Sequence, residues 1–103
     1  MNIVLAGSDE HGLGTALADI EADVRAVDIA NRPGLEEAGI HDADVYLLTE
    51  MRQATSIAVA KDLNPDVRVV IYAEGSLPDF ASRQADLVVD PNLLPPEAVA
   101  EEL

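Results

Sequence analysis

The stretch AGSDEHGLGTALAD, residues 6–19, decides how the chain is organised, because an apolar run passes directly into a turn with three glycines. The run Ile3–Ala6 leads into this turn, and residues 14–21 follow it with Leu17 and Ile20 on one side of a helical pattern. Continuous apolar runs, as opposed to alternating ones, are typical of strands that are covered on both faces. The stretch therefore predicts a buried strand, a glycine-rich turn and a helix.

Strand and helix patterns alternate along the rest of the chain. Four more short apolar runs follow, at Val24–Val27, Val45–Leu48, Val67–Tyr72 and Leu87–Val89. The segments expected to be helical are Leu35–Ala38, Arg52–Leu63, a short or irregular Ser76–Gln84, and residues 95–103. Alternation of strand and helix requires right-handed crossovers between parallel strands. The pattern predicts an α/β fold in three layers, with a doubly wound parallel five-stranded sheet in the order 2-1-3-4-5, as a single domain over residues 1–103.

A sheet of this kind binds ligands outside the carboxyl ends of its strands, at the switch point between strands one and three. The loops that follow Ala6, Val27 and Leu48 then surround one crevice. Free N–H groups at the start of the first helix would attract an anion, and glycines would let the backbone approach it. The candidate ligand-binding residues in these loops are Gly7, Ser8, Gly12, Gly14, Asp28 and Thr49.

Two acids in the first turn, Asp9 and Glu10, oppose an anionic ligand. A carboxylate about 4 Å from a phosphate costs about 1 kcal/mol in bulk water and several times more when both are desolvated. The acids therefore weaken a nucleotide prediction without excluding it, and that prediction depends on main-chain amides that stay free. With His11 they are also ligand types for a divalent metal, but three consecutive side chains rarely point to one centre. We therefore interpret them as a solvated loop and assign no metal or catalytic residue.

The composition is strongly acidic, yet it is that of a folded chain. Twenty acids stand against six basic residues, giving a net charge of −14, while 49 % of the residues are apolar. Such a surplus repels nucleic acid and anionic membrane surfaces, so neither is an expected partner. A single lysine, Lys61, and acids along the whole chain favour a halophilic protein, of haloarchaeal source. An ordinary acidic mesophilic protein is the alternative.

Several other functions lack their motifs. There is no cysteine, no Gly-x-Ser-x-Gly elbow and no Gly-Lys-Ser/Thr phosphate loop, so the sequence does not predict an enzyme. No apolar run approaches the roughly 18 residues of a membrane span. The first apolar run begins too early to leave room for a signal peptide. We therefore expect a cytoplasmic protein.

The segment LEEAGIHDADVYLLT, residues 35–49, resembles the nucleotide-binding domains of potassium-transport regulators, called TrkA N-terminal, RCK or KTN domains. In that family a short helix ending Leu-x-x-Ala-Gly-Ile leads to Ala-Asp and an apolar strand ending in threonine. These features fall on Leu35, residues 38–40, residues 43–44 and Thr49, and the resemblance continues through residues 58–73 and 85–92. It implies a module that senses NAD(H) or another adenine nucleotide and signals to a transporter or enzyme partner subunit.

The chain departs from this family in two places. Gly7 and Gly14 resemble the first and third glycines of G-x-G-x-x-G, with two additional residues between them. Between the first helix and the Leu-x-x-Ala-Gly-Ile turn, the family also has one strand and one helix more than this chain has room for. Asp28 lies 21 positions after Gly7, which suits the acid that holds the ribose, and seven before Leu35, which resembles an acid after the family's third strand. We prefer the second alignment, which implies a lost strand and helix.

Two residues keep alternative interpretations. Thr49 either lines the ligand crevice or caps a helix over residues 50–63, and Ser8 either donates to a phosphate or caps the first helix. Gln53 stands where the family often has an asparagine. A phosphoacceptor receiver domain has the same architecture, but it needs an aspartate after the third strand and a lysine after the fifth, where this chain has Thr49 and Asp90.

Three functions remain. The first prediction is a stand-alone nucleotide-binding sensor of the TrkA-N/RCK type. The alternative is a ligand-free domain that acts by association, as a homodimer or an accessory subunit. A small enzyme acting on a nucleotide comes last, because it depends on Asp9, Glu10 and His11 alone.

Overall fold

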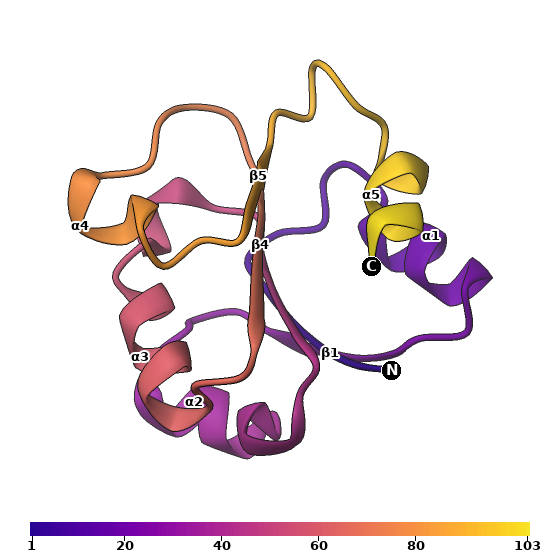
Figure 1. Ribbon diagram of the computed structural model, residues 1–103. Coiled ribbons are helices and arrows are strands. Elements are labelled where there is room, and N and C mark those ends of the chain that lie inside the picture. The colour runs from indigo at the N-terminus through magenta and orange to yellow at the C-terminus, as the bar shows by residue number, and fades with distance from the viewer.

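The computed structural model describes residues 1–103 as a five-stranded parallel sheet between two layers of helices (Figure 1). The strands are β1 (Asn2–Ala6), β2 (Asp23–Val27), β3 (Val45–Leu48), β4 (Arg68–Tyr72) and β5 (Leu87–Val89). They lie in the order β2-β1-β3-β4-β5, and every neighbouring pair is parallel. The predicted α/β fold and its strand order are confirmed.

The helices divide between the two faces of the sheet. In Figure 1 the sheet is seen edge-on, with helices on both sides of it. The first side carries α1 (Leu13–Asp19) and α5 (Pro96–Glu102). The second carries α2 (Arg32–Glu37), α3 (Ser56–Leu63) and α4 (Asp79–Ser82), with the short 3-10 turns η1 (Ile40–Asp42) and η2 (Met51–Gln53). None of these helices has the length and apolar character to cross a membrane.

The three central strands, β1, β3 and β4, each contribute to two cores, because successive side chains point to opposite faces. In β1, Ile3 and Leu5 pack with α1 and α5, whereas Val4 and Ala6 pack on the other side with α2 and α3. Both faces are covered, which is why the strands read as continuous apolar runs. The only buried polar residue is Ser56.

Several helix boundaries differ from those expected, and two of the differences have a clear physical cause. The segment Arg52–Leu63 is not one helix, because η2 ends at Gln53 and α3 begins at Ser56. Ser56 Oγ bonds the buried Tyr46 hydroxyl at 2.7 Å, while the Gln53 side chain turns toward the loops of the sheet. The second helix also starts earlier than Leu35, at Arg32, because the Asn31 side chain accepts from the Gly34 N–H at 2.9 Å and caps it.

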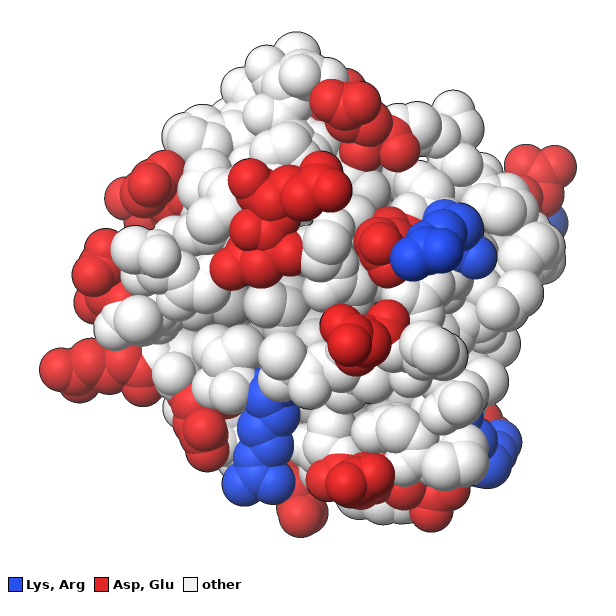
Figure 2. Space-filling model, turned by 180° about the vertical axis from the view of Figure 1, so that it is seen from behind, with Lys and Arg blue, Asp and Glu red and all other residues white.

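The surface reflects the charge of the chain. Figure 2 shows acidic side chains scattered over one whole face of the molecule, with few basic ones among them. Three ion pairs form in the structure, and they involve Arg32, Arg52 and Lys61. Arg25, on the edge strand β2, forms none. Most of the acids are therefore balanced by solvent ions and not by neighbouring side chains.

Candidate functional site

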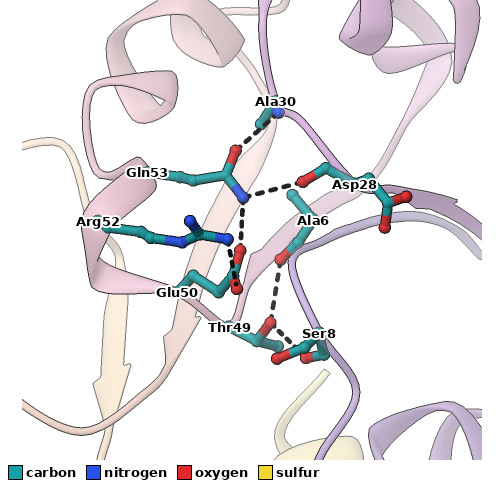
Figure 3. A network of polar contacts seen from close by, with 8 residues as sticks. All are labelled: Ala6, Ser8, Asp28, Ala30, Thr49, Glu50, Arg52 and Gln53. Atoms are coloured by element: carbon teal, nitrogen blue, oxygen red, sulfur yellow. Dashed lines mark hydrogen bonds and ion pairs between the residues drawn. The ribbon is translucent and has the colours of Figure 1, made fainter.

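The crevice predicted from the strand order lies where the loops after β1, β2 and β3 meet, and a polar network fills it (Figure 3). Thr49 joins the first and third of these loops. Its Oγ1 donates to the carbonyl of Ala6 at 3.2 Å and to that of Ser8 at 2.6 Å. Thr49 does not cap the following helical turn, whose first flanking residue is Glu50. The threonine therefore fastens the end of β3 to the β1 turn.

Position 7 must be glycine because the loop after β3 packs directly against it. Its φ of +102° is in the left-handed region, and its N–H donates to the carbonyl of Val27 at 3.0 Å. A Cβ at this position would overlap Thr49 Oγ1 and would lie 2.8 Å from Glu50 Cγ. The glycine is thus explained by packing of the chain against itself, whether or not a ligand binds.

The glycine-rich turn is bonded to its own carboxylate. Asp9 Oδ2 accepts from the N–H of Gly14 at 3.0 Å, and the Asp9 carbonyl accepts from the N–H of Gly12 at 3.4 Å. Gly14 belongs to the first turn of α1, where unpaired amides attract negative charge. Gly12 is left-handed, with φ +79° and open space beside it. Asp9 therefore occupies one amide that an anionic ligand would need.

Gln53 holds the other side of the crevice. Its Oε1 accepts from the Ala30 N–H at 2.8 Å, and its Nε2 donates to the Asp28 carbonyl at 3.0 Å and to Glu50 Oε1 at 2.6 Å. Arg52 reaches the second oxygen of Glu50 at 3.2 Å. The Gln53 hydrogen bond, with help from Arg52, lowers the pKa of Glu50. The crevice thus contains a carboxylate that stays ionised at neutral pH.

Asp28 and Ser8 are the predicted site residues with free side chains. Both are exposed, and Figure 3 shows the Asp28 carboxylate directed away from Gln53. Asp28 directly follows β2, which pairs with β1, so it lies at the end of the strand beside the first. In doubly wound sheets the ribose acid lies about 20 residues beyond the phosphate turn, which this position matches. This placement is compatible with both alignments of Asp28, so the ribose role stays a prediction.

The three polar residues of the turn diverge. Asp9 turns back to Gly14, while the His11 ring lies edge-on to Tyr72 with the ring centroids 5.7 Å apart. No three acidic or histidine side chains come together as metal ligands. Surface hollows occur elsewhere, at the amino ends of β1 and β2, between β2 and α2, and at α4.

Glu50 was missed from the sequence, and Gln53 was noted only as a departure from a family pattern. Both follow an apolar strand at the carboxyl edge of the sheet, which is the available signal for a crevice residue. The main-chain partners of Gln53, at Asp28 and Ala30, lie more than twenty positions away in sequence, so the sequence alone could not indicate these contacts.

The fold and the crevice together define a Rossmann-like α/β module whose switch point is filled by its own side chains. The family can be stated as well. The chain belongs to the Family of unknown function (DUF7126), whose model matches residues 3–103. No match to a curated protein is found by sequence.

Solved structures share the fold at low identity. The TrkA-N domain of the inner membrane protein ybaL from Escherichia coli has a TM-score of 0.68 and 21 % identity, covering 98 % of this chain and 92 % of that one. A Burkholderia pseudomallei protein described as pilus-assembly-related gives 0.71 and 17 %, covering 99 % and 85 %. A response regulator with a phosphorylated aspartic acid, from the same organism, gives 0.61 and 20 %, covering 98 % and 69 %. These likenesses show the fold alone.

Proposed function

We propose that the protein is a Rossmann-like module that acts by association with another protein chain and carries no nucleotide in its crevice. The observation that carries this proposal is the bond from the Gly14 N–H to the Asp9 carboxylate. A phosphate at the start of α1 would have to displace that carboxylate and then lie beside it. Nucleotide binding would therefore cost a hydrogen bond and add a repulsion.

The Glu50 carboxylate supports the same proposal. It lies against Gly7, the first glycine of the turn, and Gln53 and Arg52 hold it there. A dinucleotide that approached Gly7 would meet a second negative charge in a partly buried position. Exposed apolar side chains support association, because each loses unfavourable contact with water in an interface. The most exposed large ones are Met1, Ile29, Phe80, Val88 and Leu93.

Titration calorimetry in molar KCl tests the proposal, with NAD, NADH, ATP, AMP and CTP as separate titrants. We expect no saturable heat and no rise in unfolding temperature with any of them. Saturable heat with one nucleotide would overturn the proposal. Gly14→Asp is the matched variant, because a second carboxylate at the start of α1 would abolish true binding there while leaving nonspecific heat unchanged.

A nucleotide sensor of the TrkA-N/RCK type is the second candidate. The observation that favours it is Asp28, exposed at the end of β2, together with the likeness in fold to a TrkA-N domain. In this case NAD(H) or an adenine nucleotide would bind with its phosphates at Gly7, Ser8, Gly12 and Gly14. Asp28 would hold the ribose and Thr49 would line the site, and a transporter or enzyme subunit would receive the signal. The same titration separates the two candidates.

A further inference from the structure

We infer that two copies of this chain associate edge to edge through β2, antiparallel, about a two-fold axis at Val24. The two five-stranded sheets then form one continuous sheet. This inference rests on the association proposed above and names its surface and its partner. It comes from three features of β2: unpaired main-chain groups, a self-complementary charge pattern, and exposed isoleucines at both ends.

The first feature is the free edge. β2 pairs only with β1. The Asp23 N–H donates to the Met1 carbonyl, and the Val27 carbonyl accepts from the Gly7 N–H, so the odd-numbered residues of the strand direct their main-chain groups at β1. The intervening residues, Val24 and Ala26, direct theirs outward. Each therefore offers an N–H and a carbonyl to another strand.

The second feature is charge. Asp23 and Arg25 lie on the same face of β2 and line one hollow together with Ala38 and Gly39. The Arg25 side chain forms neither an ion pair nor a hydrogen bond within the chain, although the chain has 20 acids. An arginine with unused donors on a sheet edge is suited to a carboxylate on a second strand.

The register follows from these two features. In an antiparallel pair that places Val24 opposite Val24 of the second copy, Asp23 of each copy lies opposite Arg25 of the other. Asp23 and the opposite Arg25 then form a non-hydrogen-bonded pair of the antiparallel ladder. In such pairs the Cα atoms are about 4.5 Å apart and the side chains are closest. Two ion pairs form, related by the axis. A shift of the axis to Arg25 would place the two arginines opposite each other, which destabilises the pairing.

The third feature is apolar. Ile20 precedes β2 and is 40 % exposed, and Ile29 follows the strand and is 70 % exposed. An antiparallel arrangement brings the start of one β2 to the end of the other, so Ile20 of one copy lies near Ile29 of the second. Charged residues on an edge strand usually prevent edge pairing. Here their alternating sign permits it for a copy of the same strand.

Sedimentation and light scattering of the full chain in molar KCl test the dimer. The unmodified protein is expected to dimerise. Arg25→Asp and Asp23→Arg should each weaken the dimer by about tenfold or more, because each creates two like-charged pairs. The double variant Asp23→Arg/Arg25→Asp reverses both signs and should restore association. Restoration cannot come from a general loss of folding, and circular dichroism of each variant checks the fold directly.

The register has its own test, because the natural chain contains no cysteine. Val24→Cys places two cysteines opposite each other with Cα atoms about 5.5 Å apart, within the span of a disulfide. Oxidation should link this variant as a dimer. Ala26→Cys, whose counterpart lies several positions along the second strand, should stay unlinked.

Three results would overturn the inference: a monomer at every concentration, a dimer that Arg25→Asp leaves unchanged, or a link formed by Ala26→Cys in preference to Val24→Cys. They are distinguishable from failure of the proposed function. If the protein is a monomer and binds no nucleotide in the titration, the β2 dimer is wrong, but association with a different chain is still possible. If the protein is a β2 dimer and binds a nucleotide, the ligand-free function is wrong, but the dimer is supported.

Discussion

Asp9 does for α1 what a bound anion does in a nucleotide-binding turn. The residue that flanks the start of α1 is Gly12, which has no side chain to cap the helix. Asp9, three positions before Gly12, takes this role, because its carboxylate accepts from the Gly14 N–H. A carboxylate at a helix start is favoured both by the hydrogen bond and by the helix dipole. The acid that opposes a ligand is thus the one that completes the turn.

Removal of this carboxylate gives the first prediction. Asp9→Ala should lower the free energy of unfolding by about 1 kcal/mol, because the Gly14 N–H loses its partner. The freed amide should also allow sulfate to raise the unfolding temperature more in the variant than in the unmodified protein. Urea unfolding measures the first effect, and thermal unfolding with and without sulfate measures the second. Glu10→Ala is the control, since that side chain has no bond, and equal behaviour of the two variants would contradict the role of Asp9.

Gln53 gives the second prediction. Gln53→Glu replaces the Nε2 donor with an oxygen that faces the Asp28 carbonyl and the Glu50 carboxylate. The free energy of unfolding at pH 7 should fall by about 2 kcal/mol, because two hydrogen bonds become repulsions. The amide of Ala30 should exchange its hydrogen faster as the loop after β2 loosens.

Urea unfolding and amide exchange measured by NMR check this prediction. Arg52→Gln is the control, since it removes only an ion pair whose arginine is 79 % exposed and should change stability little. If the two variants lose the same stability, the network does not depend on Gln53.

At the scale of elements, the strands and their order could be predicted from the sequence, and the polar crevice could not. Apolar runs mark the strands in the sequence, and they are most continuous in β3 and β4, which helices cover on both faces. The boundary between η2 and α3 depends on Ser56 meeting Tyr46 across the core. The positions of Thr49 and Gln53 depend on carbonyls of distant loops. Local periodicity contains no information on such partners.

The start of β5 is held by one acid that joins three elements. Asp86 Oδ2 accepts from the Val69 N–H of β4 at 2.8 Å and from Lys61 of α3 at 3.1 Å. Burial raises the pKa of Asp86, but the Val69 hydrogen bond and the bond and charge of Lys61 outweigh it, so the net pKa is lowered. A lowered pKa in the folded state means that the carboxylate stabilises the fold above its unfolded pKa, near 3.9, and loses that effect as pH falls through the folded value.

Asp86→Asn should therefore cost about 1 kcal/mol of unfolding free energy at pH 7, a modest figure because the side chain is partly exposed. The difference from the unmodified protein should shrink as the pH falls below about 4, because the carboxyl gains a proton first in the unfolded chain and only at the lowered pKa in the fold. Urea unfolding at a series of pH values measures it. Asp62→Asn, which removes an exposed pair with Arg32, is the control. A difference that stays constant with pH would contradict the assignment.

For the whole molecule, the crevice at the carboxyl ends of the strands and the free edge of the sheet at β2 differ in how far their polar groups are paired. The three loops that normally receive a ligand are bonded to one another, whereas β2 keeps unpaired main-chain groups and an arginine without a partner. Proteins with the same sheet topology can thus use different contact surfaces, either the carboxyl ends of the strands or an edge strand. The fold alone does not determine which surface is used.

The net charge gives the last prediction. A charge of −14 within a radius of gyration of 12.1 Å repels itself, and three ion pairs offset little of it. Added KCl shortens the Debye length from about 10 Å at 0.1 M to about 3 Å at 1 M, so the repulsion is screened in the folded state, where the charges are closest. The unfolding temperature should rise with KCl by about 4–8 °C for each kcal/mol gained, and then level off. Thermal scans of a variant with Glu36→Gln and Glu101→Gln, two exposed acids without partners, should show a weaker dependence on KCl. A maximum of stability at low salt would contradict this prediction, because screening would then relieve no repulsion.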